Sequence, residues 1–361
     1  MMKRVYFLGI FALSSLLFVS QFLPDAVTAQ KPAVVDSKGV QTPTPTPLPA
    51  PTIREEDIIE KVETELVNLN VRVVDRNNRP INNVQESEFK IYEDNVLQKI
   101  EFFSKSEVPT NYSLVIDNSG SLRSQIEQVI DASKLLVAAN KPEDETSIIR
   151  FISSDKIEIV QDFTSNKTDL NDALDNLYID GGQTAIIDAV YLAASKVSEY
   201  EKSQNKVDRK RRALILVSDG EDVSSYYSQQ QLFDLLRETD VQIYVVGFVK
   251  DLSTDKGFIT KSKQGKAKAF LEKLASETGG KAYFPNALSE LNGIAREIAS
   301  ELRTQYSIGY LPSNDRDDGT FRNIKVVVTD GPGNQKRIAL TRSGRMAEGG
   351  SSAAPTIQRP N

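Results

Sequence analysis

Two alternating hydrophobic patterns between residues 112 and 303 constrain the fold of this chain more than any other feature of its sequence. Short runs of continuous apolar residues, such as 213–217, are followed by longer stretches in which apolar residues recur at helical spacing. This alternation is typical of a mostly parallel sheet with helices on both faces. We therefore predict a doubly wound α/β domain over residues 109–303. The expected strands are 112–116, 147–152, 157–160, 213–217, 241–246 and 281–284, and the expected helices are 122–139, 168–177, 185–200, 228–239, 266–277 and 288–303.

Two flanking segments, 56–108 and 304–343, carry the period-two alternation of β-strands. Each segment alone is too short to bury much apolar surface. In a doubly wound domain the first strand begins, and the last helix ends, at the same edge of the sheet, so both flanks leave from one side. We therefore predict that six short strands from the two flanks form one small β-sandwich. Two separate modules of marginal stability are the alternative.

The two ends of the chain have compositions unlike the rest. Residues 1–29 combine a basic start, an uncharged apolar run over 5–23 and the small-residue end Val27-Thr28-Ala29, which predicts a secretory signal cleaved after Ala29. An uncleaved membrane anchor is the alternative, because the run is long enough to span a bilayer. Residues 30–55 form a Pro/Thr-rich linker, either a semi-rigid stalk or plain disorder. The Gly-, Ser-, Ala- and Pro-rich tail 344–361 is predicted to be disordered. The protein is thus expected outside the cytoplasm: secreted, periplasmic or on the cell surface.

Composition limits the chemistry that this chain can perform. It contains no Cys and no His, which excludes zinc sites of the usual kind and Ser-His-Asp or Cys-His catalysis. Any metal must be held by oxygen, which leaves Mg²⁺, Ca²⁺ or Mn²⁺. The net charge of −6 argues against general affinity for nucleic acid.

Three short fragments place oxygen-bearing side chains at one edge of the predicted sheet. Residues 117–121 (DNSGS) and 218–220 (SDG) follow apolar strands, and 181–184 (GGQT) precede a helix. In an open α/β sheet, ligands bind at the carboxyl edge, where the strand order reverses; in the commonest order, the first and fourth strands are neighbours there. Asp117 and Asp219 would end those two strands. Each fragment alone is better explained as a turn or helix cap than as a site, but their order and placement together predict an oxygen site suited to Mg²⁺.

These side chains resemble the metal-ion-dependent adhesion site (MIDAS) of von Willebrand factor type A (VWA) domains. The resemblance covers about residues 110–303, and the 184–189, 89–94 and 305–310 segments are similar to those of bacterial secreted members. It implies a Rossmann-like VWA fold and a bound Mg²⁺, or Mn²⁺ or Ca²⁺. The hydroxyls would contact the metal directly or through water, whereas the two carboxylates would hold it mainly through water and hydrogen bonds. The residues that carry the resemblance are Asp117, Ser119, Ser121, Thr184 and Asp219.

The resemblance also implies a function. Because neutral hydroxyl ligands leave a divalent cation short of negative charge, the cation would bind an Asp or Glu carboxylate of an extracellular or surface protein. We therefore expect a secreted or surface-held adhesion module and not an enzyme, with no nucleic-acid partner and no membrane contact except through an uncleaved anchor. Tyr226 and Tyr227 are candidate partner contacts, or they pack at the start of a helix.

Two alternatives remain at this point. One is a Mg²⁺-dependent phosphoryl-transfer hydrolase that uses Asp117 as the acceptor. It is disfavoured because phosphatases of this layout usually carry a second acid where this chain has Ser119, and because no phosphate-cradling Gly loop with Lys is present. The other is a structural or assembly protein whose metal site is vestigial.

Overall fold

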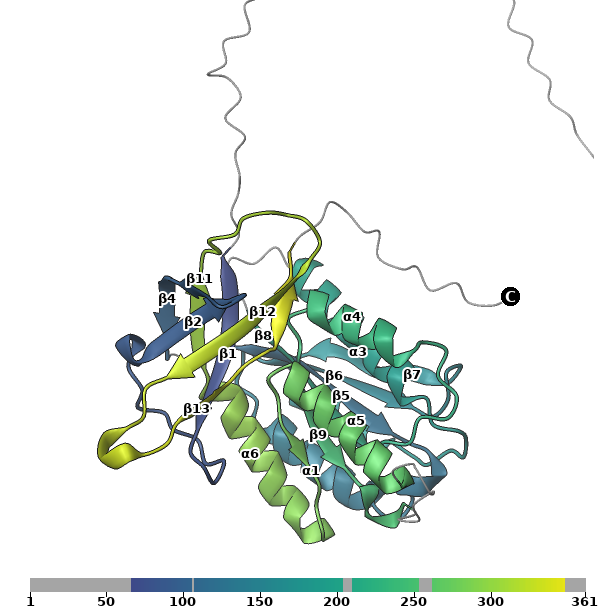
Figure 1. Ribbon diagram of the computed structural model, residues 1–361. Helices are drawn as coiled ribbons and strands as arrows, with labels where there is room; N and C mark the ends of the chain where they lie inside the picture. Colours follow the sequence, from purple (N-terminus) through teal and green to yellow (C-terminus); the bar gives the residue numbers. More distant parts are fainter. Residues whose placement is uncertain (1–65, 106, 204–209, 253–261, 348–361) are drawn as a thin grey trace, which may run out of the picture. The chain divides into compact units, whose positions relative to one another are not determined.

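A six-stranded sheet forms the centre of the α/β domain in the computed structural model, which describes residues 66–105, 107–203, 210–252 and 262–347 (Figure 1). Its strand order is β10-β9-β8-β5-β6-β7, so the order reverses between β5 and β8, which pair in parallel. Only β7 is antiparallel to its neighbour. The first and fourth strands of the domain are therefore adjacent, as predicted. The strands are β5 (Thr110–Asp117), β6 (Glu145–Phe151), β7 (Ile157–Thr164), β8 (Arg211–Ser218), β9 (Gln242–Gly247) and β10 (Ala282–Tyr283).

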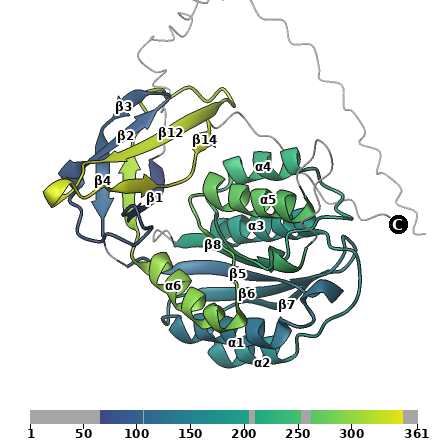
Figure 2. The ribbon, with the colours of Figure 1, turned by 60° about the horizontal axis from the view of Figure 1, so that its bottom comes forward.

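Helices cover both faces of this sheet, as the alternating pattern predicts (Figure 2). Side chains alternate along each strand, so Leu114 of β5 packs in the core under α1, α2 and α6, whereas Val115 packs under α3, α4 and α5. The chain therefore has the doubly wound α/β architecture. The helices are α1 (Ile126–Ala139), α2 (Lys167–Asp175), α3 (Ile186–Ser203), α4 (Gln229–Glu238), α5 (Lys263–Glu277) and α6 (Leu291–Arg303), with short 3₁₀ turns at η3 (Gly120–Leu122), η4 (Val249–Asp251) and η5 (Leu288–Glu290).

The first helix begins later than the apolar pattern predicts. The pattern starts at residue 122 because Leu122 is fully buried, but residues 120–122 form the 3₁₀ turn η3 and regular α-helix begins at Ile126. The backbone amide of Leu122 donates to the carbonyl of Ser119 at 3.2 Å. Burial of Leu122 thus fixes the loop that carries the first predicted site fragment.

Strands from both flanks combine in two four-stranded sheets, which we call the β module. The sheets have the orders β13-β1-β11-β4 and β14-β12-β2-β3, and one core cluster takes side chains from both. The prediction that the flanks join is confirmed in part, because the sheets contain eight strands instead of the six expected. The strands are β1 (Val67–Val74), β2 (Phe89–Glu93), β3 (Val96–Gln98), β4 (Ile100–Ser104), β11 (Tyr306–Tyr310), β12 (Phe321–Val328), β13 (Ile338–Leu340) and β14 (Gly344–Met346).

The C-terminal end of the β module corrects one predicted boundary. Residues 344–346 were expected in a disordered tail, but they form β14, which pairs antiparallel with β12. The guanidinium of Arg345 donates to the carboxylate of Glu93 at 2.9 Å, and Ala347 is buried, so long-range contacts order a segment whose composition suggests disorder. The β segment therefore extends beyond residue 343.

Several predictions about the ends of the chain fall outside the described residues. These are the signal or anchor at 1–29, the linker at 30–55, the start of the N-terminal β segment and the tail from 348 onwards. Within the part of the chain that the structure describes, no helix combines the length and the hydropathy needed to span a bilayer.

Buried polar contacts join the β module to the α/β domain. Arg72 of β1 forms an ion pair with Glu301 of α6, and both side chains are at most 5% exposed. Arg72 also donates to the carbonyl of Gly280 at 3.2 Å. Arg211 of β8 donates to the carbonyls of Leu302 and Gln305 at 2.7 and 2.8 Å, and burial lowers the pKa of its guanidinium to about 10. The end of α6 is thus fixed from both sides.

Candidate metal site

Asp117, the last residue of β5, lies at the centre of the candidate site. Its carboxylate is fully buried and accepts hydrogen bonds from the Ser119 amide at 2.9 Å and the Ser218 hydroxyl at 2.7 Å. The pKa of Asp117 is raised to about 6, chiefly by burial and also by the negative charge of Asp219, while the hydrogen bonds from Ser119 and Ser218 act to lower it. The carboxylate is thus held in a fixed orientation, buried and close to a second negative charge.

The turn after β8 brings the second carboxylate to the same edge. Asp219 is 4% exposed, and its carboxylate accepts the amide of Glu221 at 3.0 Å. The Ser218 hydroxyl that donates to Asp117 also accepts the amide of Gly220 at 3.1 Å. Gly220 has φ +81°, and a Cβ there would lie 2.8 Å from the side chain of Leu271, so this turn requires glycine. Ser218 therefore links the ends of β5 and β8.

Thr184 reaches the site from the loop before α3. Its carbonyl accepts the amides of Val223 and Ser224 at 2.8 and 3.2 Å, which fixes this loop against the turn after β8. The amide of Asp180 donates to the carbonyl of Asn118 at 3.1 Å, which fixes the same loop against the end of β5. The Thr184 side chain is 6% exposed, and its hydroxyl has no hydrogen-bond partner among the described residues. It is therefore available as a ligand.

The remaining two hydroxyls come from the loop that follows β5. The Oγ atoms of Ser119 and Ser121 lie 2.9 Å apart; Ser119 is buried, whereas Ser121 is exposed. The structure thus brings all three predicted fragments together, with four of the five side chains buried and one at the surface. No group of three or more carboxylates, Cys or His that could hold a metal occurs in the described ranges. The donor set of two carboxylates and three hydroxyls fits a hard divalent cation such as Mg²⁺.

Two supporting carboxylates were not assigned a role from the sequence. The buried carboxylate of Asp188 accepts the backbone amides of Tyr226 and Tyr227, each at 2.8 Å. Asp222 accepts the amide of Ile187 at 3.2 Å near the start of α3. A sequence signal for a buried role of Asp188 was present, because Asp188 is the one charged residue in the otherwise apolar run 185–190.

The two candidate partner-contact tyrosines have different environments. The Tyr227 ring is half-buried and stacks on Tyr191 at a centroid distance of 3.9 Å and an angle of 9°. The Tyr226 ring is 83% exposed and meets Tyr227 edge to face at 5.4 Å. Tyr227 therefore packs near the start of α4, which was the alternative, and Tyr226 is the one free to contact a partner.

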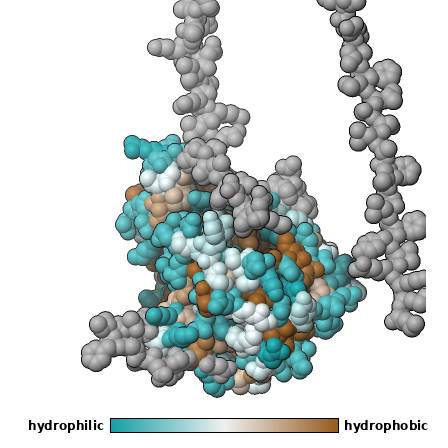
Figure 3. Space-filling view, turned by 90° about the vertical axis from the view of Figure 1, so that its right-hand side faces the viewer, coloured by the Kyte–Doolittle hydropathy of each residue, from teal (hydrophilic) through white to brown (hydrophobic). Residues whose placement is uncertain are grey.

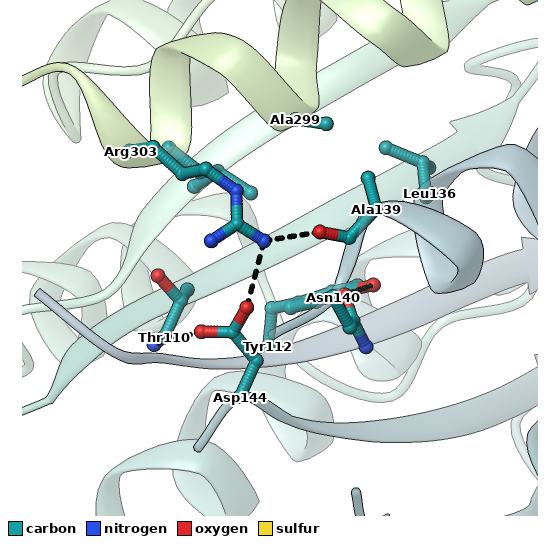
Figure 4. A pocket seen from close by; sticks show the side chains of 9 residues that line it. Thr110, Tyr112, Leu136, Ala139, Asn140, Asp144, Ala299 and Arg303 are labelled. Atoms are coloured by element: carbon teal, nitrogen blue, oxygen red, sulfur yellow. Dashed lines mark hydrogen bonds and ion pairs between the residues drawn. The ribbon is translucent and has the colours of Figure 1, made fainter. Parts of the chain in front are cut away.

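A small polar pocket lies at the opposite end of β5 (Figure 4). The guanidinium of Arg303 donates to the carboxylate of Asp144 at 2.8 Å, and that carboxylate also accepts the amide of Thr110 at 2.9 Å. The Tyr112 hydroxyl donates to Asn140 at 2.8 Å, and burial raises the pKa of Tyr112 to about 12. The pocket holds only about 10 Å³, the room of one water molecule. We therefore interpret this cluster as structural.

Comparison with known proteins gives one family. The model of the von Willebrand factor type A domain matches residues 113–297, more than half of the chain. No curated protein matches the sequence. One similar solved structure is an aerotolerance-related membrane protein from Bacteroides fragilis, with 18% identity over 54% of this chain and 98% of that chain and a TM-score of 0.41. A second is proximal thread matrix protein 1 from the mussel byssus with a zinc-occupied MIDAS motif, with 19% identity over 55% of this chain and 48% of that chain and a TM-score of 0.43. A third is a von Willebrand factor type A protein from Catenulispora acidiphila, with 11% identity over 77% of this chain and 73% of that chain and a TM-score of 0.44.

Proposed function

Because this chain belongs to the von Willebrand factor type A domain family, we propose that its α/β domain is a metal-dependent protein-binding module that acts outside the cytoplasm. Ser119, Ser121 and Thr184 contact a divalent cation, Mg²⁺ or else Mn²⁺ or Ca²⁺, and Asp117 and Asp219 support it. The observation that carries this proposal is the environment of Asp117. A buried carboxylate with a pKa raised to about 6 and two fixed hydrogen-bond donors is suited to stabilise a positive charge beside it.

Contacts among the described residues support this arrangement of the site. The Ser119 amide and Ser218 hydroxyl fix the orientation of the Asp117 carboxylate, and the contacts between loops fix Thr184. Four of the five donor side chains are buried, and Ser121 is exposed at the outer side of the site. A bound cation supplies an electrophilic position there for an Asp or Glu carboxylate of a partner.

Two observations favour binding over phosphoryl transfer. Asp117 would have to expose an oxygen to a phosphorus atom, but its side chain is fully buried and each of its oxygens accepts a hydrogen bond. Ser119, which lies where a second acid would be expected, bonds to Ser121 instead of facing a substrate as a proton donor.

The proposed location of the module rests on the N-terminal sequence. The secretory pattern in residues 1–29 supports an extracytoplasmic location, secreted, periplasmic or on the cell surface, with membrane contact only through an uncleaved N-terminal anchor. The partner class is an extracellular or surface protein that presents Asp or Glu. The net charge of −6 supports the expectation that nucleic acid is not a partner.

Partner capture tests this proposal directly. The wild-type protein, incubated with extracellular material in Mg²⁺, is expected to retain partners that are released by chelator, whereas Asp117→Ala is expected to retain none of them in either condition. Asp131→Ala removes an exposed carboxylate of α1 and serves as the matched control, with capture like the wild type. Identical capture by the wild type and Asp117→Ala, with and without Mg²⁺, would contradict the proposal.

The metal affinity is expected to depend on pH. Since the metal-free pKa of Asp117 is about 6, a proton competes with the cation as the pH falls through that value. One pH unit below the pKa, about ten carboxyl groups are protonated for each ionised one, so the apparent Mg²⁺ affinity should fall about tenfold. Mg²⁺ titrations followed by melting temperature at about pH 7 and about pH 5 measure this. Equal affinities at the two pH values would show that Asp117 does not control binding.

A further inference from the structure

Tyr226 is the most exposed large aromatic side chain near the candidate site. Its side chain is 83% exposed, and it belongs to the loop that carries Asp219. A single exposed aromatic residue is common on protein surfaces and requires no explanation. The groups that surround Tyr226 distinguish it from other exposed aromatic residues.

The position of Tyr226 is fixed by buried groups. The carboxylate of Asp188 is 2% exposed, and its two oxygens accept the amides of Tyr226 and Tyr227 at 2.8 Å each. The Tyr226 ring contacts Tyr227 edge to face, and Tyr227 stacks on Tyr191 of α3. Because the aromatic side chain is already ordered, a partner that contacts it loses little conformational entropy in doing so.

Other apolar side chains gather at the same edge. Among the described residues between 110 and 303, the exposed large hydrophobic side chains are Ile159, Tyr178, Val223 and Tyr226, and the last three belong to loops of the site. The carbonyl of Tyr178 accepts the side-chain amide of Asn118 at 2.7 Å, and the amide of Val223 donates to the Thr184 carbonyl. One face of the molecule, drawn in the space-filling view, has brown apolar areas among hydrophilic ones (Figure 3). The site therefore has an apolar rim.

The charges on this rim favour a cation from the partner. Glu221 pairs with Lys263 at 2.9 Å. Among the described residues, the exposed carboxylate of Asp222 accepts only from neutral donors, the Ile187 amide and the Ser225 hydroxyl. No Lys or Arg of the described ranges lies over the Tyr226 ring, whereas the guanidinium of Arg150 lies 4.2 Å from the centroid of Tyr178. An aromatic ring and a carboxylate without a cationic partner attract a positive charge and repel a second carboxylate.

We propose that Tyr226 and Asp222 form a second contact beside the metal, which binds an Arg or Lys side chain of the partner. The partner segment would thus present a carboxylate to the cation and a basic residue close to it in sequence. This inference rests on the proposed function and specifies the class of partner. A cation–π contact at an exposed position changes affinity by about two- to fivefold.

Selection from a random dodecapeptide library displayed on phage tests the inference. The library is panned on the full chain in Mg²⁺ and eluted with chelator, in parallel on the wild type, Tyr226→Ala, Tyr226→Phe and Asp117→Asn. Wild type and Tyr226→Phe are expected to enrich Asp or Glu together with a nearby Arg or Lys. Tyr226→Ala is expected to enrich Asp or Glu with a weaker preference for the basic residue, because Asp222 remains in place. The affinity of peptides selected on the wild type should be about two- to fivefold lower for Tyr226→Ala than for the wild type.

The outcomes separate the inference from the proposed function. If the wild type enriches acidic peptides without a basic preference, or if Tyr226→Ala keeps that preference at full strength, the second contact is wrong while the metal-dependent function stands. If the wild type gives no chelator-eluted enrichment beyond that of Asp117→Asn, both are wrong. A weakened basic preference beside an intact acidic one on Tyr226→Ala, and the enrichment of neither residue on Asp117→Asn, supports both.

Discussion

Replacement of Asp117 by Asn is expected to stabilise the metal-free protein and to abolish the stabilisation that Mg²⁺ gives the wild type. The pKa of this carboxyl group is about 6 in the folded protein and 3.8 in its ordinary state. A carboxyl whose folded pKa is raised loses stability as the pH rises from the unfolded value to the folded one, and the loss is complete at neutral pH. The shift corresponds to about 3 kcal/mol, taken as an upper bound. Asn keeps the shape of the side chain and removes the charge.

Thermal unfolding in chelator and in Mg²⁺ measures both parts of this result. The wild type should gain about 2.7 kcal/mol at a Mg²⁺ concentration one hundred times its dissociation constant, and Asp117→Asn should gain nothing. Asp131→Asn, an exposed substitution on α1, should behave like the wild type. A variant at position 117 that is less stable than the wild type in chelator and still gains stability from Mg²⁺ would refute the role assigned to Asp117.

Replacement of Arg72 by Ala is expected to destabilise the protein by about 3 kcal/mol. The change leaves the buried carboxylate of Glu301 without its main partner and the carbonyl of Gly280 without a donor. The expected loss is at the lower end of the range for a broken buried pair, because Lys281 remains 3.8 Å from Glu301. Urea unfolding of the full chain measures this loss in the free energy of unfolding.

A double variant separates the charge effect from packing. Arg72→Met combined with Glu301→Leu removes both charges and keeps apolar volume, so it should recover most of the stability lost in Arg72→Ala. Arg79→Ala breaks an exposed pair with Asp75 and should cost less than about 1 kcal/mol. If Arg72→Ala costs no more than Arg79→Ala, the junction between the β module and the α/β domain does not depend on this pair.

The sequence predicted the α/β domain well because its signals are local. Continuous apolar strands such as 213–217 are buried on both faces and stand out from the helices around them. The strand order followed from the general preference of such sheets. The β module was predicted less completely, because short edge strands carry little pattern. Residues 344–346 form a strand only through the distant partners β12 and Glu93.

The candidate site shows the same division between local and long-range information. The fragments around Asp117, Thr184 and Asp219 could be found because each lies next to a strand or helix with a clear pattern. The roles of Ser218 and Asp188 could not be found in this way, because the groups that they bind lie far away in the sequence. Ser218 at the end of β8 donates to Asp117 at the end of the neighbouring strand β5, and Asp188 accepts the amides of Tyr226 and Tyr227. Only the three-dimensional arrangement reveals these contacts.

The connection between the β module and the α/β domain has a mechanical consequence. The chain enters the α/β domain after β4 and returns from it into β11, and Ser104 and Ser307 are directly paired in the ladder between these strands. The α/β domain is therefore an insertion between two adjacent strands. If a partner bound at the proposed metal site pulled on the domain, the load would leave the domain through both strands side by side. Neither connection would have to bear it alone.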